Sequence, residues 1–178
     1  LLSTHSSPLP PLPSLLSHIV LTVRYATGLL PCNTRTEAHA EFPSFPAFAR
    51  KLTSYLKADP LSKALAVVYL SRLELPSTAR GEFSTPHKLY LAALLASIKF
   101  LRDDVSTEVN ARVAHYLPNL FSVREICLLE RGLLRELGWS MWVDHTELLG
   151  VFKLAGASPQ VLSALTGSKK PILHSSFE

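Results

Sequence analysis

Apolar positions recur every three or four residues through most of the chain beyond residue 44, which is the period of an amphipathic α-helix. No segment alternates apolar and polar residues at period two, so the sequence predicts no β-sheet. The predicted fold class is all-α. The expected helices run over residues 44–58, 59–75, 88–102, 106–117, 122–137 and 148–154, and a last short one begins at residue 158.

Residues typical of helix ends support these boundaries. Asp59 places a capping oxygen directly before Pro60, and proline favours the first helical position. Ser122 and Glu125 have the spacing of a capping box, in which each side chain binds a backbone N–H group at the helix start. Gly138 follows the expected end of the same helix, where a glycine commonly stops it.

The expected helix 88–102 differs from the others because it is apolar on nearly every side. Between Leu89 and Leu101, only Ser97 and Lys99 are polar. A helix of this kind must be surrounded by other helices rather than laid on a surface. The sequence therefore predicts a bundle wrapped around this central helix.

The remaining segments predict flanks on either side of a helical domain. Four prolines among the first thirteen residues favour an extended, disordered opening. The expected order is a Pro-rich segment at 1–13, an N-terminal helix at 14–30, a linker at 31–43, the helical domain at 44–155, and a short helix with a tail at 156–178.

Composition and charge exclude several classes of protein. The chain of 178 residues is 47% hydrophobic and 18% charged, which allows a sizeable core and argues against wholesale disorder. Its net charge of +4 is scattered, whereas a nucleic-acid binder gathers basic residues into a stripe. The apolar stretch at residues 15–30 carries Arg24 near its middle, which is atypical of a membrane anchor. We therefore expect an intracellular protein that binds neither nucleic acid nor membrane.

Motifs for catalysis are missing from the sequence. It contains no Gly-rich phosphate loop, no HExxH, no CxxC and no Gly-x-Ser-x-Gly elbow. Two cysteines cannot supply a disulfide framework or a four-cysteine zinc site. We expect a protein that is not an enzyme and that holds no cofactor or metal.

Two charged residues stand on apolar helix faces. At about 100° per residue, Glu130 falls within an arc of leucine and isoleucine side chains, and Lys99 shares a side with Ala92 and Leu95. Such charges need a partner or contact with water. Lys99 can extend to solvent at a helix C-terminus and Glu130 can form an ion pair within the chain, or both can lie at the rim of an apolar surface that binds a partner. The charged residues outside the arc are Arg124, Arg131, Arg135 and Glu136.

An aromatic cluster follows the helix that carries Glu130. Trp139 and Trp142 are the only tryptophans, and Met141 between them is the only methionine. These residue types fill cores, and they are also enriched at the centres of protein interfaces. The cluster is a second candidate for a partner surface.

Three ordered segments resemble the cyclin box, and the resemblance covers roughly residues 45–152. They are Ala66–Leu73 (AVVYLSRL), Leu91–Asp103 (LAALLASIKFLRD) and Leu128–Trp139 (LLERGLLRELGW). The loop at 75–81 and the helix start at 85–90 are most similar to the fungal single-box cyclins of the Pcl type. Ser71 stands where cyclins of the cell-cycle type usually have an aspartate.

The resemblance implies a five-helix bundle with flanking helices, a central third helix, and a function. The chain would be a regulatory cyclin subunit in the nucleus or cytoplasm, not an obligate homo-oligomer, that activates a cyclin-dependent serine/threonine kinase by positioning the kinase αC helix. If Lys99 and Glu130 face that kinase, both should stay partly solvated in the free chain. The alternative is a helical adaptor or a transcription-factor-type box without a kinase partner. The residues implied to bind the kinase are Lys99, Phe100, Glu130, Leu134, Trp139 and Met141.

Overall fold

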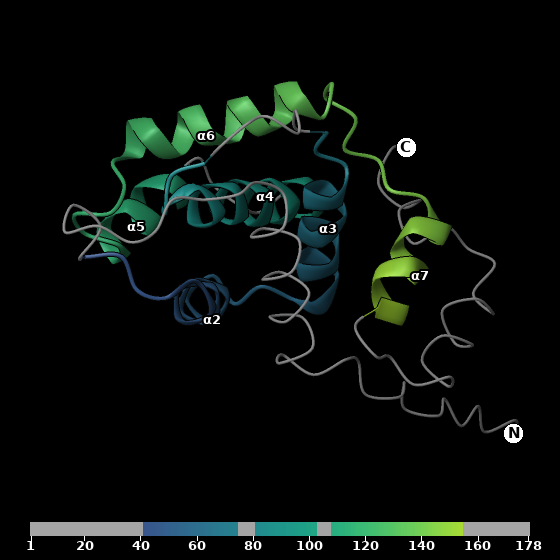
Figure 1. Ribbon diagram of the computed structural model, residues 1–178, viewed down its shortest axis with the longest axis horizontal. Helices are drawn as coiled ribbons and strands as arrows, with labels where there is room; N and C mark the ends of the chain where they lie inside the picture. Colours follow the sequence, from purple (N-terminus) through teal and green to yellow (C-terminus); the bar gives the residue numbers. More distant parts are fainter. Residues whose placement is uncertain (1–40, 75–80, 103–107, 155–178) are drawn as a thin grey trace, which may run out of the picture.

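Figure 1 shows the computed structural model, which describes residues 41–74, 81–102 and 108–154. Within these ranges the chain forms helices and no β-strand, so the predicted all-α fold class is confirmed. Within them, no helix is long and apolar enough to cross a membrane. The helices are α2 (Phe45–Tyr55), α3 (Pro60–Ser71), α4 (Thr85–Leu101), α5 (Val109–Tyr116), α6 (Val123–Glu136) and α7 (His145–Leu154).

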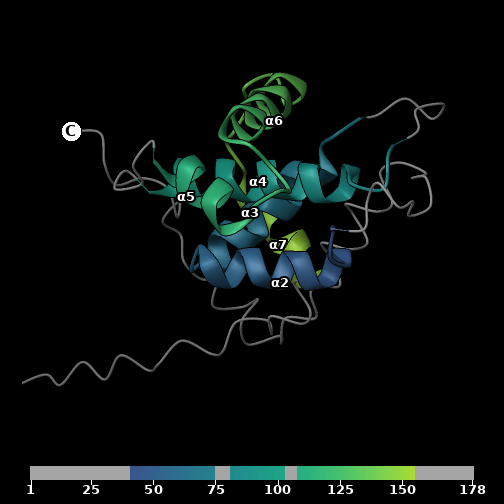
Figure 2. The ribbon, with the colours of Figure 1, turned by 90° about the vertical axis from the view of Figure 1, so that its left-hand side faces the viewer.

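Helix α4 is the centre of the bundle, as its apolar sequence predicted. All nine residues at positions 90–98 are buried. Helices α3, α6 and α2 pack against α4, α5 packs against α6, and α7 packs against α3. Figures 1 and 2 show α6 and α2 on opposite sides of α4. The buried hydroxyl of Ser97 bonds to the carbonyl of Leu94 on its own helix, so this polar residue is accommodated without a distant partner.

The capping predictions fit the observed helix ends. The side chain of Asp59 accepts a hydrogen bond from the backbone N–H of Ser62 at 2.9 Å. The capping box at the start of α6 is complete, because Glu125 N–H donates to Ser122 Oγ at 3.2 Å and Ser122 N–H donates to Glu125 Oε2 at 2.8 Å. These bonds satisfy backbone groups that a helix start leaves without a partner in the helix.

Several helix boundaries differ from the prediction. Helix α2 ends at Tyr55 rather than near Ala58, and Lys57 just beyond it has a left-handed φ of +48°. Helix α4 begins at Thr85 rather than at residue 88, because Pro86 has the φ that a first turn requires. Helix α3 ends at Ser71 rather than near Leu75. Leu75 precedes Pro76, and a residue before proline is disfavoured in the helical region.

Helix α7 also begins earlier than predicted, at His145 rather than at residue 148, because Asp144 Oδ1 accepts from the N–H groups of Thr146 and Glu147. The predicted helices at 14–30 and from Ser158, the segment 1–13 and the capping residue Ser106 lie outside the described residues.

His87 joins the first turn of α4 to the segment before α2. Its ring lies edge-on to the rings of Phe42, Phe45 and Phe48, with centroids 5.0–5.4 Å apart. The Nε2 atom lies 3.0 Å from the carbonyl oxygen of Pro43. Because the ring is 1% exposed, burial lowers its pKa from the ordinary value of 6.5.

We expect His87 to make the fold less stable in acid. Between the lowered pKa of the folded state and the unfolded value of about 6.5, the unfolded chain binds more protons, so the free energy of unfolding falls as pH falls below about 6.5. His87→Gln should flatten this dependence in urea denaturation between pH 5 and pH 8, since glutamine does not titrate. The exposed His115 provides the control. An equal flattening in His115→Gln would contradict the assignment.

Candidate partner-binding site

Lys99 and Glu130 meet where α4 ends beneath α6. The Nζ atom of Lys99 lies 2.7 Å from Oε1 and 2.8 Å from Oε2 of Glu130. The Lys99 side chain is 32% exposed, whereas that of Glu130 is 10% exposed. Lys99 stands in the last turn of α4, where the helix dipole favours a cation.

Asn110 of α5 completes this cluster. Its Oδ1 accepts a hydrogen bond from Lys99 Nζ at 2.9 Å, and its Nδ2 donates to Glu130 Oε2 at 2.6 Å. The same amide group lies 3.3 Å from Cys127 Sγ. Asn110 is 4% exposed, so its polar atoms depend on these contacts. We call Lys99, Asn110 and Glu130 the polar triad.

The polar triad shows which of the alternatives for Lys99 and Glu130 describes the free chain. Lys99 and Glu130 are paired within the free chain, so the ion-pair alternative describes its structure. The expectation that both stay partly solvated is met by Lys99 and is wrong for Glu130, which is buried. Glu130 is covered because Asn110 and Lys99 both close over its carboxylate, a contact that the helical wheel of α6 does not include.

The other four predicted residues are all at least partly accessible. Phe100 is 38% exposed and Trp139 is 66% exposed, so both aromatic side chains are available to a partner. Leu134 and Met141 are half-buried. Leu134 lies four residues after Glu130 on α6, so the two share one side of the helix. Met141 packs against the hydrophobic core.

The end of α6 holds Trp139 in an unusual backbone conformation. The N–H of Trp139 donates to the carbonyl of Leu134 at 2.8 Å, and that of Gly138 donates to Arg135 at 2.9 Å. These two bonds form a Schellman motif, which glycine favours at its left-handed position. Gly138 has φ +57°, as the sequence led us to expect of a helix stop, but Trp139 is also left-handed at +62°. A bulky residue in this region is strained, and this turn presents the indole of Trp139 to solvent, where it is 66% exposed.

Arg72, which directly follows the last residue of α3, anchors the segment that follows Trp139. Its guanidinium donates to the carbonyl oxygens of Ser140 and Trp142 at 3.0 and 2.7 Å, and to both carboxylate oxygens of Glu147 at 2.9 and 2.6 Å. These hydrogen bonds from Arg72 lower the pKa of Glu147. Tyr69 on α3 donates to the carbonyl of Met141 at 2.9 Å. Sequence reasoning missed both anchors and Asn110, because their partners lie on distant helices.

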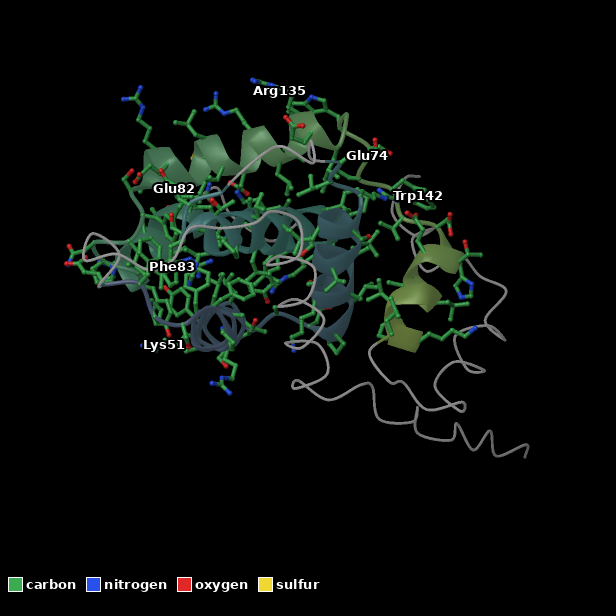
Figure 3. The ribbon with its side chains drawn as sticks, viewed as in Figure 1. Lys51, Glu74, Glu82, Phe83, Arg135 and Trp142 are labelled. Atoms are coloured by element: carbon green, nitrogen blue, oxygen red, sulfur yellow. The ribbon has the colours of Figure 1, made fainter. Side chains whose placement is uncertain are left out.

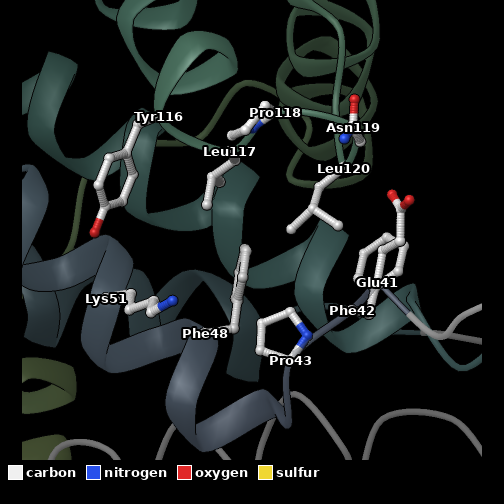
Figure 4. Close-up of a pocket in the computed structure, with 10 residues that line it drawn as sticks. All are labelled: Glu41, Phe42, Pro43, Phe48, Lys51, Tyr116, Leu117, Pro118, Asn119 and Leu120. Carbon is white, nitrogen blue, oxygen red and sulfur yellow. The ribbon is translucent and has the colours of Figure 1, made fainter.

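The described residues show no other arrangement suited to chemistry. No group of three or more His, Cys, Asp or Glu side chains among them could hold a metal ion. A pocket of about 530 Å³ lies between α2 and the turn that joins α5 to α6 (Figure 4). Lys51 and Glu41 are among its lining residues, but it includes none of the six predicted residues. The polar triad and the exposed aromatic side chains are the better candidate site.

Three curated proteins from Saccharomyces cerevisiae (strain ATCC 204508 / S288c) are similar to the chain. PHO85 cyclin-1 is 36% identical over 109 residues, which cover 60% of this chain and 38% of that protein. PHO85 cyclin-2 is 28% identical over 109 residues, covering 60% of this chain and 35% of the relative. PHO85 cyclin-9 is 31% identical over 84 residues, which cover 46% of this chain and 27% of that relative. This chain is a homologue of the PHO85 cyclins.

The homology confirms the predicted resemblance to Pcl-type cyclins, and the helical bundle agrees with a cyclin-like fold. The chain spans between 27% and 38% of the length of these cyclins. No protein-family model matches the chain, and no solved structure matches it.

Removing Lys99 should destabilise the chain more than removing Glu130. Lys99→Met leaves a buried carboxylate with Asn110 as its remaining partner in the triad, and we expect a loss of about 2–3 kcal/mol in the free energy of unfolding. Glu130→Gln leaves an ammonium that water already reaches, and we expect a loss of about 1 kcal/mol. Chemical denaturation measures both. Equal losses, or no loss in Lys99→Met, would contradict the burial of Glu130.

Trp139 offers a test of the strained helix end. Trp139→Gly and Trp139→Ala both remove the exposed indole, but only glycine adopts the left-handed conformation without strain. We expect the glycine variant to be more stable than the alanine variant by about 1 kcal/mol in thermal or chemical unfolding. If alanine is as stable as glycine, φ at this position is not strained in solution.

Proposed function

We propose that this chain is the regulatory subunit of a cyclin-dependent serine/threonine kinase and that it activates the kinase by positioning the αC helix. The homology to PHO85 cyclins carries the proposal and favours a kinase of the PHO85 type. It argues against an adaptor or transcription-factor-type box. The proposed function is regulatory rather than catalytic, and we expect it to be performed in the nucleus or cytoplasm.

The polar triad suits this function because it is organised before a partner binds. A carboxylate accepts about four hydrogen bonds. Glu130 accepts three from the triad, of which one reaches Oε1, and Lys99 remains a third exposed. The pair can therefore engage a partner without breaking its own contacts. A charged group already held in place loses less side-chain entropy when it binds.

Apolar contacts would supply most of the affinity. Phe100 follows Lys99 directly, and Trp139 follows Leu134 through the Schellman turn. Exposed aromatic side chains lose accessible surface on binding and are frequent energetic centres of interfaces. The charged pair would then set the orientation of the bound helix, since buried charges at an interface contribute specificity more than affinity.

Activation follows from preferential binding of one kinase conformation. A protein kinase requires its Lys–Glu ion pair and its metal-binding loop in place, and the position of the αC helix controls both. A rigid surface that binds the active arrangement better shifts the kinase population toward it. Helix α4, buried along positions 90–98, gives the surface that rigidity.

A reconstituted kinase assay tests the proposal. The chain, mixed with PHO85 kinase, should co-purify with it and raise its phosphorylation of a protein substrate. Phe100→Ala should weaken the complex about 10- to 30-fold, as expected when an interface anchor is truncated. Leu154→Ala on α7 is the matched control, since Leu154 is also a large exposed apolar residue. Loss of activation in both variants, or in neither, would argue against the proposed surface.

A further inference from the structure

The outward side of α6 carries a row of arginines that the proposed kinase site does not use. Arg124, Arg131 and Arg135 occur with Leu128 at the spacing i, i+4, i+7 and i+11, so the four share one side of the helix. We call them the arginine stripe. All three arginines are exposed, and Leu128 is 55% exposed. Figure 3 shows Arg135 pointing away from the bundle.

The chain does not neutralise this stripe within the part that the structure describes. None of the three ion pairs there includes an arginine of the stripe. No acidic residue stands three or four positions from any of them on α6. Arg131 and Arg135 are themselves four residues apart, which is mildly destabilising for like charges. The helix dipole favours Arg135 in the last turn of α6, but it disfavours Arg124 in the first turn, so helix stability does not explain the whole stripe.

The 178 residues of the sequence offer no acidic run that matches the stripe. The only adjacent acidic residues of the sequence are Asp103 and Asp104, and the net charge of the chain is +4. A second copy would bring the same positive charge and the same shortage of acidic runs. The stripe extends about 16 Å along the helix at 1.5 Å per residue, which a short peptide can cover.

The exposed leucine distinguishes a peptide from a nucleic acid. A phosphate backbone places charged oxygens rather than an apolar group beside Leu128, and three arginines neutralise at most about three phosphates, so the electrostatic contribution to binding nucleic acid would be small. A peptide with an apolar residue between carboxylates matches both features, because the guanidinium group pairs well with carboxylates. We propose that the arginine stripe binds an acidic peptide segment of a protein partner, with an apolar side chain on Leu128 and carboxylates on the arginines.

Fluorescence anisotropy with the full chain and no kinase tests this directly. The probe is a short labelled peptide in which glutamates flank a central leucine, compared with the same peptide carrying glutamines. The glutamate peptide should bind, and less tightly as salt is raised. Replacing all three arginines by glutamine should weaken binding about tenfold, since each exposed ion pair contributes a few-fold. The matched control removes three exposed charges elsewhere, as Arg50→Gln, Lys51→Gln and Lys153→Gln.

Leu128→Ser separately tests the apolar contact and should weaken binding several-fold. Equal binding of the glutamine peptide, or equal weakening in the control variant, would overturn the proposal. Tighter binding of a labelled DNA duplex than of the glutamate peptide would assign the stripe to nucleic acid instead. Dimerisation of the wild-type chain in sedimentation, lost in the arginine variant, would assign it to a second copy. Because no kinase is present, each result is independent of the proposed regulatory function.

Discussion

The burial of α4 is the constraint on which the rest of the structure depends. Nine consecutive side chains of this helix are shielded from water, so it has no face that can stay exposed. Neighbouring helices must cover it, and α2, α3 and α6 do so from different sides. Helices α2 and α6 each use one face for this purpose, whereas α3 is buried along residues 64–70 and is covered in turn by α7. The outer face of α6 is therefore free of the packing requirement, and the binding surfaces proposed for this helix depend on that freedom.

The polar triad is a consequence of where this apolar run stops. Lys99 comes directly after Ile98, which is 3% exposed, so its ammonium emerges at the boundary between core and water. The completed capping box fixes where α6 begins, and the buried residues Ile126 and Leu133 fix which side of the helix faces α4. Glu130 arrives opposite Lys99 for that reason. The ion pair therefore depends both on where α4 ends and on which side of α6 faces it.

The sequence predicted features that depend on neighbouring residues and missed those that depend on tertiary contacts. Ser122, Glu125 and Gly138 act within one turn of their own helix, and spacing alone identified them. Arg72 and Glu147 are 75 positions apart, and no local pattern pairs them. Asn110 is an ordinary polar residue in the sequence. It becomes important only because α5 packs against α6, which places its amide beside Glu130.

One side of α6 packs against the bundle and another is exposed for binding, and Glu130 contributes to both packing and the proposed binding surface. Ile126 and Leu133 are buried against the bundle and hold the helix in place, whereas the arginine stripe has no partner among the described residues. Effects of changes in residues without shared partners are approximately additive, so the stripe can vary without altering the core. Glu130 cannot, because its carboxylate closes the polar triad and also stands at the proposed kinase surface. A substitution of Glu130 would therefore affect both folding and binding of a partner. A substitution of the exposed Phe100 would affect binding alone.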